Sequence, residues 1–242
     1  MEQPTVEVTD VGAVRRRARA VAIGVFDGVH IGHRQVIADC DTVLTFDPHP
    51  LAVLRPGAAP ALLTTVPAKV RRLAALGVRE VVVLPFDSRW AAVAAPAFVD
   101  DLLVDRLGAH TVSVGANFRF GAGGQGGGHT LRGDTRFRTR IAPLVRSAAG
   151  VVSSTRIRAS LSAGDLEQVT RLLGRRHTLT GRAGPGGTVV VDPGLVVPPA
   201  GRYRVMANDR PTGAVIDGAG CLTVDDRLSG QVELVLLQRD GC

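Results

Sequence analysis

The chain has 242 residues, 45% of them hydrophobic, which is enough for one large domain or for an ordinary domain followed by a small one. It contains no run of 18 apolar residues and no N-terminal secretory signal, so we expect a cytoplasmic protein that has no membrane partner. The net charge of +7 would suit nucleic acid, but one Trp, one Tyr and seven Phe are too few to build a base-stacking surface. We therefore expect no nucleic-acid partner and attribute the charge to a phosphate-bearing small substrate.

Cysteine and lysine usage narrow the possible chemistry further. Cys40, Cys221 and Cys242 have spacings that suit neither a zinc site nor a disulfide framework, so we expect reduced thiols. Lys69 is the only lysine, and the Gly-Lys-Ser/Thr ending of a Walker-type phosphate loop is therefore absent.

Short β-branched runs alternate with helical stretches from Val21 to about Val145, a pattern typical of an open Rossmann-like α/β domain with a parallel sheet. The expected strands are Val21–Phe26, Asp41–Phe46, Glu80–Leu84, His110–Gly115 and Arg140–Val145. Proline at the start and glycine after the end predict helices over 67–76 and 96–107. The stretch 121–128 has six glycines in eight residues and predicts a mobile surface loop without regular structure.

The pattern changes in the last third of the chain. Helices are expected over 154–161 and 165–173, where Asp165 and Gln168 have capping-box spacing. Short strands follow, which predicts a small antiparallel β-barrel or sandwich. The expected strands are Thr188–Val191, Arg202–Met206, Ala214–Ile216, Cys221–Val224 and Val232–Gln238. We place a domain boundary near Arg175, between residues 1–175 and 176–242.

The strongest chemical signal is the segment 26–33, which reads FDGVHIGH and connects the first expected strand to a helix. Amides at the start of a helix face an anion, and Gly32 allows a phosphate to approach the backbone closely. His30 and His33 are placed to stabilise charge on an α-phosphate and its leaving pyrophosphate during an in-line displacement. A lone histidine there would more often be structural, but two at this spacing favour function.

A second signal is the segment 153–158, SSTRIR, at the start of a helix. Its hydroxyls can cap the helix and bind phosphate, and Arg158 lies one turn beyond Ser154. The alternative is an ordinary serine cap beside solvated arginines.

Two further segments end expected strands at the edge where ligands of parallel sheets bind. One is 46–50, FDPHP, whose prolines predict a rigid turn rather than a helix. The other is 115–121, GANFRFG, whose rings could pack against a planar ligand, although for Phe118 we favour a place in the core.

Together these four segments resemble the adenylyltransferase module of the bacterial bifunctional riboflavin kinase/FMN adenylyltransferase (FAD synthetase) family, within the HxGH nucleotidyltransferase superfamily. The resemblance covers residues 20–177. It implies transfer of AMP from ATP to FMN, giving FAD, with Mg²⁺ bound through the ATP phosphates. The implied catalytic residues are His30, His33, Asn117 and Arg158. The implied ATP-binding residues are Gly24, Phe26, Asp27, Gly28, His30, Gly32, His33, Ser154, Thr155 and Arg158. The implied flavin-binding residues are Phe46, His49, Pro50, Asn117 and Phe120.

The sequence also departs from this family. About seven residues separate His33 from the strand at Asp41, so the first crossover is clipped, and together with the glycine-rich loop this could reshape the acceptor pocket. The Pro-Thr-Ala-Asn signature of the kinase domain is replaced by GPGGTVVVD at 184–192. Glu233, where the kinase has its catalytic glutamate, is interpreted as an exposed charge. We therefore predict a degenerate barrel without riboflavin kinase activity, retained for packing or for contacts in a homo-oligomer.

Two alternatives to a monofunctional FMN adenylyltransferase stay open. The first is a specialised nucleotidyltransferase that acts on a modified flavin or on another phosphorylated metabolite. The second is a flavin- or nucleotide-binding regulator without turnover, although a pure binder has little need for side chains directed at a leaving pyrophosphate.

Overall fold

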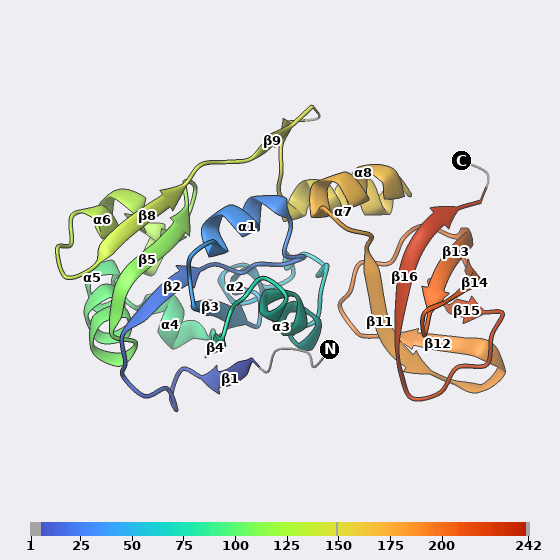
Figure 1. The fold of residues 1–242 in the computed structure, drawn as a ribbon, viewed down its shortest axis with the longest axis horizontal. Coiled ribbons are helices and arrows are strands. Elements are labelled where there is room, and N and C mark those ends of the chain that lie inside the picture. The colour runs from blue at the N-terminus through green and yellow to red at the C-terminus, as the bar shows by residue number, and fades with distance from the viewer. Residues whose placement is uncertain (1–5, 149, 241–242) are drawn as a thin grey trace. The chain divides into compact units, whose positions relative to one another are not determined.

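The structure is a computed structural model, and it describes residues 6–148 and 150–240. By its internal contacts the chain separates into two compact units, shown in Figure 1. The first consists of residues 1–60 and 69–146, and the second of residues 61–68 and 147–242. Helices α7 and α8, which follow residue 153, thus group with the second unit, and the division of the chain near Arg175 into two functional modules stays a prediction.

A six-stranded parallel sheet forms the centre of the first unit, in the order β1-β4-β3-β2-β5-β8. Its strands are β1 (Glu7–Asp10), β2 (Arg19–Ile23), β3 (Thr42–Asp47), β4 (Glu80–Pro85), β5 (Ala109–Gly115) and β8 (Arg138–Ala142). The five expected strands and the α/β class are confirmed. The sequence did not predict β1, because this short edge strand is largely exposed and has no hydrophobic run.

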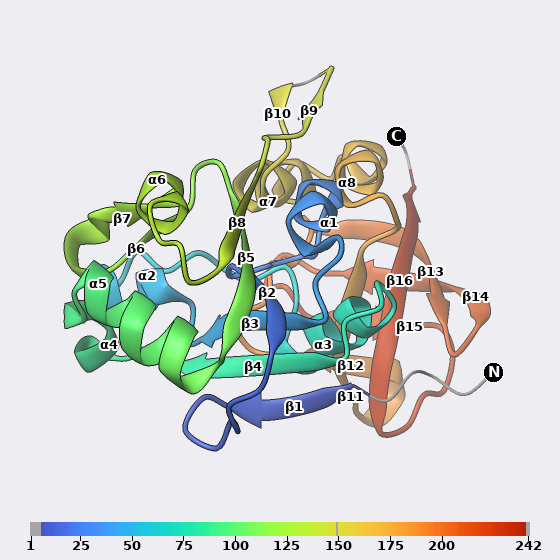
Figure 2. The ribbon, with the colours of Figure 1, turned by 60° about the vertical axis from the view of Figure 1, so that its left-hand side comes forward.

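Helices lie on both faces of this sheet, as Figure 2 shows. They are α1 (Ile31–Ile37), α2 (Pro50–Leu54), α3 (Val66–Ala74), α4 (Ser88–Ala92), α5 (Ala95–Ala97), the π-helix η1 (Phe98–Arg106) and α6 (Gly128–Arg132). The single helix expected over 96–107 is therefore α5 followed by η1, where the amide of Leu107 donates to the carbonyl of Leu102, five residues back, at 2.9 Å. The structure corrects the expected regular helix in this respect.

Alternate residues of each strand point to opposite faces of the sheet, and the two faces differ in polarity. Leu44 and Val112 belong to the main hydrophobic cluster, which also contains buried side chains of η1. On the other face, Thr45 hydrogen-bonds to a side chain of α3, and Ser113 donates to a main-chain carbonyl of α1. The main hydrophobic cluster thus lies between the sheet and η1, and on the face toward α1 and α3 the buried residues Val43 and Val81 are joined by these polar strand residues.

The short helix α1 accounts for the clipped crossover between β2 and β3. Arg140, on β8, donates from Nη2 to the carbonyls of Gln35 and Val36 at 2.9 and 3.0 Å, and also to that of Ala38. These are carbonyls at the end of α1, which have no partner within the helix. A seven-residue helix is therefore sufficient to complete this βαβ unit, because a neighbouring strand supplies its C-terminal cap.

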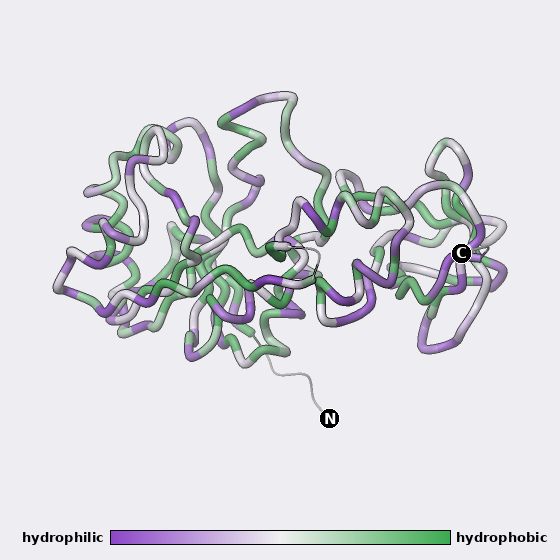
Figure 3. Tube along the Cα trace, turned by 90° about the horizontal axis from the view of Figure 1, so that it is seen from above, coloured by the Kyte–Doolittle hydropathy of each residue, from purple (hydrophilic) through white to green (hydrophobic). Residues whose placement is uncertain are grey.

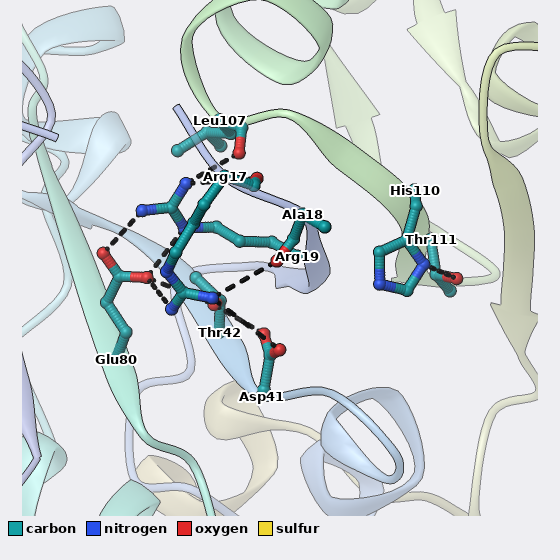
Figure 4. A network of polar contacts seen from close by, with 9 residues as sticks. All are labelled: Arg17, Ala18, Arg19, Asp41, Thr42, Glu80, Leu107, His110 and Thr111. Carbon is teal, nitrogen blue, oxygen red and sulfur yellow. Dashed lines mark hydrogen bonds and ion pairs between the residues drawn. The ribbon is translucent and has the colours of Figure 1, made fainter. Parts of the chain in front are cut away.

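A buried ion-pair network joins the amino ends of the strands, as Figure 4 shows. Arg19 donates from Nε and Nη2 to the carboxylate of Glu80 at 2.7 and 3.0 Å, and both residues are 2% exposed. Arg17 donates to the same carboxylate at 2.6 Å, and Thr42 at 3.3 Å. Burial alone would raise the pKa of Glu80, but these partners outweigh it and lower that pKa. The network lies at the edge opposite to the carboxyl ends of the strands, which indicates a structural role.

The second unit combines two helices with a closed antiparallel barrel in the order β11-β12-β15-β14-β13-β16. The helices are α7 (Ser154–Ser162) and α8 (Leu166–Leu173). The barrel strands are β11 (Thr178–Ala183), β12 (Thr188–Val191), β13 (Gly201–Ala207), β14 (Arg210–Ile216), β15 (Leu222–Val224) and β16 (Gln231–Arg239). Asp165 caps α8 by accepting from the amide of Gln168 at 2.8 Å, and Gly174 ends it at φ 69°. The expected small barrel is confirmed, and β11 adds a strand that the sequence did not predict individually.

Hydrophobic and hydrophilic segments alternate along the chain (Figure 3), and among the residues that the structure describes no helix combines the length and the apolar character of a membrane span. Cys40 and Cys221 are free thiols, the first buried and the second exposed, and Cys242 lies outside the described residues.

Candidate active site

The segment that carries the two histidines forms a strained turn at the carboxyl end of β2. Phe26, Gly28 and Val29 have φ values of 51°, 80° and 42°. Such values are uncommon for an aromatic or β-branched residue, and they persist only where the surrounding structure holds them. The amide of Val29 donates to the carbonyl of Phe26 at 3.1 Å and closes the turn. Its backbone is thus set before α1 begins.

His30 and His33 cap each other at the start of α1. The amide of His33 donates to Nδ1 of His30 at 3.2 Å, and the amide of His30 donates to Nδ1 of His33 at 3.3 Å. The rings are stacked, with centroids 3.5 Å apart and planes 15° apart, and Phe26 meets the His33 ring edge-on at 5.2 Å. Since Nδ1 of each ring accepts a hydrogen bond, a neutral ring carries its proton on Nε2.

The surroundings keep His33 in this neutral form. Burial lowers the pKa of His33 well below its ordinary value, and the charges of His30 and Lys69 lower it further. An imidazolium at His33 would carry a proton on Nδ1, and this nitrogen could then no longer accept from the amide of His30. The geometry therefore directs Nε2 of His33 as a fixed neutral donor, a chemistry suited to phosphate oxygens.

The turn contains one further predicted ATP-binding residue, Asp27, and is linked to two residues that motif reasoning did not identify, Thr45 and Lys69. Asp27, inside the turn, is 2% exposed. Thr45 donates to the carbonyl of Val25 at 3.0 Å, and Lys69 donates to Thr45 at 3.2 Å. One feature of the sequence could have drawn attention to Lys69, since it is the only lysine of the chain.

The segment after β3 differs from its expectation. Pro50 begins helix α2, and His49 caps it by accepting from the amide of Leu51 at 3.1 Å. The expected rigid turn without a helix is wrong, because proline at the first helical position loses no hydrogen bond and already has a helical φ. Phe46 is 8% exposed and packs edge-on against Phe86 at 5.9 Å.

The segment after β5 turns back through Asn117, which is exposed. Phe118 is partly buried against the main hydrophobic cluster, in line with the core position that we favoured. Phe120 is 7% exposed and packs against Phe98 and Phe118, with centroids 5.1 and 5.7 Å away. In this structure Phe120 is therefore part of the core as well as of the predicted flavin-binding set.

The glycine-rich stretch 121–128 has regular structure, which corrects its reading as a mobile loop. It contains a 3₁₀ turn (η2, Ala122–Gly124), then β7 (Gly126–Gly127), which pairs with β6 (Arg119–Phe120), and then the start of α6. A Cβ on Gly126 would lie 2.7 Å from the ring of Phe120, and one on Gly121 would lie 2.7 Å from the amide nitrogen of Ala95. These glycines permit close packing, so their number does not indicate flexibility here.

In the second unit, the SSTRIR segment begins α7 as expected. Ser153 caps the helix by accepting from the amide of Arg156 at 3.3 Å. Ser154 and Arg158 are half-buried and lie one turn apart, and Thr155 is exposed. Nε of Arg158 donates to the carbonyl of Ala61 at 2.6 Å, which fixes the guanidinium at this end of the helix.

The two stretches that concern the kinase signature lie in the barrel. Residues 184–192 form a 3₁₀ turn, η3 (Pro185–Gly187), that leads into β12. Glu233 lies on β16, opposite Thr180 of β11, and is exposed as expected.

Comparisons with known proteins agree with this arrangement. A protein-family model for FAD synthetase matches residues 13–156. The bifunctional riboflavin kinase/FMN adenylyltransferase of Listeria monocytogenes is 35% identical over 190 residues, which are 73% of this chain and 58% of the relative. The Escherichia coli protein of the same name is 36% identical over 175 residues, 67% of this chain and 56% of the relative.

A crystal structure of a macrolide-efflux protein from Streptococcus pneumoniae is similar with a TM-score of 0.84 at 23% identity, covering 97% of this chain and 100% of that one. This likeness shows the fold alone. The chain spans 58% and 56% of the lengths of the Listeria and Escherichia relatives. Since the family model matches more than half of the chain, including the paired histidines, the chain belongs to the FAD synthetase family.

Proposed function

We propose that the chain is an FMN adenylyltransferase, which transfers AMP from ATP to the phosphate of FMN and releases pyrophosphate. The observation that carries this proposal is the pair of imidazoles, His30 and His33, locked by reciprocal capping in a domain of the FAD synthetase family. The relatives that carry FMN adenylyltransferase in their names support the choice of FMN as acceptor.

The proposed chemistry is an in-line displacement at the α-phosphorus of ATP. An oxygen of the FMN phosphate forms the new P–O bond, and the bond from the α-phosphorus to the bridging oxygen of pyrophosphate breaks. The FMN phosphate is already ionised at neutral pH, so no general base is needed, and catalysis consists of positioning and charge stabilisation. The Nε2–H groups of His30 and His33 would donate to α-phosphate oxygens as negative charge builds up. We place Asn117 between the two phosphates.

The remaining phosphate ligands are proposed at the start of α7. Ser154, Thr155 and Arg158 would bind the β- and γ-phosphates through two hydroxyls and a guanidinium. The hydrogen bond from Arg158 to Ala61 supports this role, because it reduces the freedom that the long side chain would lose on binding.

Mg²⁺ fits this proposal as an ion that enters with ATP. Among the described residues no group of three or more His, Cys, Asp or Glu side chains could hold a metal, whereas phosphate oxygens and water are ligands that Mg²⁺ prefers. When bound, the ion would neutralise part of the phosphate charge.

The flavin is proposed to bind near the carboxyl ends of β3 and β5. Phe46 and Phe120 are 8% and 7% exposed, so we propose that they form the wall behind the isoalloxazine ring and that His49 and Pro50 lie at its edge. The proposed arrangement therefore does not require the isoalloxazine ring to stack on an exposed aromatic side chain.

We further propose that the barrel has no riboflavin kinase activity. The replacement of the Pro-Thr-Ala-Asn signature by the glycine-rich turn at η3 supports this, since a threonine and an asparagine would be needed to bind nucleotide and magnesium there. Formation of FMN from riboflavin and ATP by the purified chain would contradict it.

The test is a pyrophosphate-release assay with ATP and Mg²⁺, run with FMN, with riboflavin and without acceptor, followed by chromatography of the products. We expect FAD in the FMN reaction and in no other. Retained ATP binding without pyrophosphate release from FMN would contradict the proposal, and would favour a different phosphorylated acceptor or a binding protein without turnover.

A further inference from the structure

Lys69 is the one lysine in a chain that has 28 arginines, and it is buried. It lies on α3 and is 4% exposed. Arginine and lysine are not equivalent in such a place, because an ammonium is a compact charge with a readily shifted pKa, whereas a guanidinium is a broad planar fork. The rest of the chain uses arginine, apart from histidine, for its basic side chains. A buried lysine here therefore indicates a position that needs the compact ammonium group rather than a guanidinium.

Hydrogen bonds connect this lysine to the strained turn of the active site. Nζ of Lys69 donates to Oγ1 of Thr45 at 3.2 Å, and Thr45, fully buried on β3, donates to the carbonyl of Val25 at 3.0 Å. Val25 directly precedes Phe26, where the positive φ values begin. The relay from Lys69 through Thr45 therefore ends at Val25, the residue directly before the turn.

Charges add a second link between Lys69 and the turn. Burial lowers the pKa of Lys69 to about 8, while the carboxylates of Asp27 and Asp47 act in the opposite direction. Asp27 lies inside the turn and is itself buried, and its carboxylate is one of the two charges that act on Lys69. Burial prevails over both carboxylates, which means that the ammonium is held in the folded protein at a net cost in stability.

The charge of Lys69 also acts on the second histidine. After burial and His30, it is the third cause that lowers the pKa of His33. Protonation of His33 at Nδ1 would break the hydrogen bond from the amide of His30, and with it one half of the reciprocal cap. A positive charge nearby disfavours this protonation and so preserves the geometry of both rings.

We propose that Lys69 is a positioning residue for the transfer reaction: through Thr45, and through its charge near Asp27, it holds the turn that presents His30 and His33 in their mutually capped arrangement. This inference rests on the proposed function for its consequence in catalysis. The positioning itself is a property of the free protein and can be measured without substrate.

The experiment compares four variants with the wild type. Lys69→Met removes charge and donor, Lys69→Gln keeps a donor without the charge, and Thr45→Val breaks the relay while leaving the charge. Arg71→Met removes one exposed positive charge from the same helix and serves as the matched control. NMR titration of the His33 imidazole and steady-state kinetics of FAD formation are measured for each.

We expect the pKa of His33 to rise in both Lys69 variants and to stay unchanged in Arg71→Met. In Lys69→Met, kcat should fall roughly 10- to 100-fold, the range that a small misplacement of reacting groups produces, while KM for ATP changes less than about threefold. Thr45→Val should lower kcat without raising the pKa of His33.

An unchanged kcat and an unchanged His33 titration in both Lys69→Met and Lys69→Gln would overturn the proposal. If Lys69→Met does not fold, as circular dichroism would show, Lys69→Gln and Thr45→Val carry the same test. A wild-type protein that forms no FAD would refute the proposed function and not the positioning, because the His33 titration is recorded without ATP or FMN.

Discussion

Lys69 permits a quantitative test of how strongly the fold acts on one buried charge. Burial lowers the pKa of Lys69 to about 8 from its ordinary value of 10.5, in spite of Asp27 and Asp47. That difference corresponds to about 3 kcal/mol by which the folded chain disfavours the ammonium relative to the unfolded chain. Because Lys69 is 4% exposed, solvent screens this effect little.

The sign of the pH dependence follows from proton binding. Below pH 8 the ammonium is protonated in both states, and the penalty is fully present. Between about pH 8 and 10.5 the unfolded chain keeps the proton and the folded chain releases it, so the free energy of unfolding rises with pH in this window. Lys69→Met lacks this contribution. The difference in unfolding free energy, wild type minus variant, should therefore increase by about 3 kcal/mol across the window.

Two measurements check this prediction. Urea denaturation of both proteins at a series of pH values gives the two stability profiles. Protein labelled with [¹³C]lysine gives one side-chain signal, because the sequence has one lysine, and its titration reports the pKa directly. Parallel stability profiles, together with a titration midpoint near 10.5, would refute the reasoning.

Three further predictions concern other parts of the first unit. Glu80→Gln should lower the free energy of unfolding by about 3–5 kcal/mol, because it leaves Arg19 buried without its counter-ion, whereas the double variant Arg19→Met/Glu80→Leu should recover much of the loss in denaturation experiments. His33→Ala should cost roughly 2–4 kcal/mol of transition-state stabilisation, measured as kcat for FAD formation, and unchanged turnover would remove the role of the cap in catalysis. Gly126→Ala should destabilise by about 1–3 kcal/mol, because its Cβ would overlap a phenyl ring, and Gly218→Ala, which has open space around it, is the control in thermal melts.

Sequence reasoning succeeded where the signal is local. The central strands were found from β-branched runs that a parallel sheet buries on both faces. The histidine motif was found because a strand, a glycine-containing turn and a helix start follow one another within about a dozen residues. In α8, the cap at Asp165 and the end at Gly174 were both visible in the sequence. None of these features requires a partner from a distant part of the chain.

The sequence failed where the meaning of a residue depends on its neighbours in space. The six glycines of 121–128 were interpreted as freedom of the backbone, whereas Gly121 and Gly126 fit against Ala95 and Phe120. Composition cannot separate a glycine that permits motion from one that permits contact. Similarly, α1 is too short to be recognised as a full crossover, since Arg140, which caps its end, follows about a hundred residues later.

The relation between Lys69 and the histidines suggests why the chain keeps a charge that burial disfavours. An imidazolium would attract the phosphates of ATP in the bound substrate as well as in the transition state, and such uniform binding does not raise kcat. In the proposed transfer reaction, a fixed neutral donor at His33 would respond mainly to the charge that develops in the transition state, and it would need no reorganisation as that charge develops. Burial and nearby positive charge keep His33 neutral, and Lys69 supplies part of that charge from α3, where it donates to Thr45 of β3. The folded chain would then accept the stability cost of a buried ammonium at Lys69 because that charge helps to keep His33 neutral.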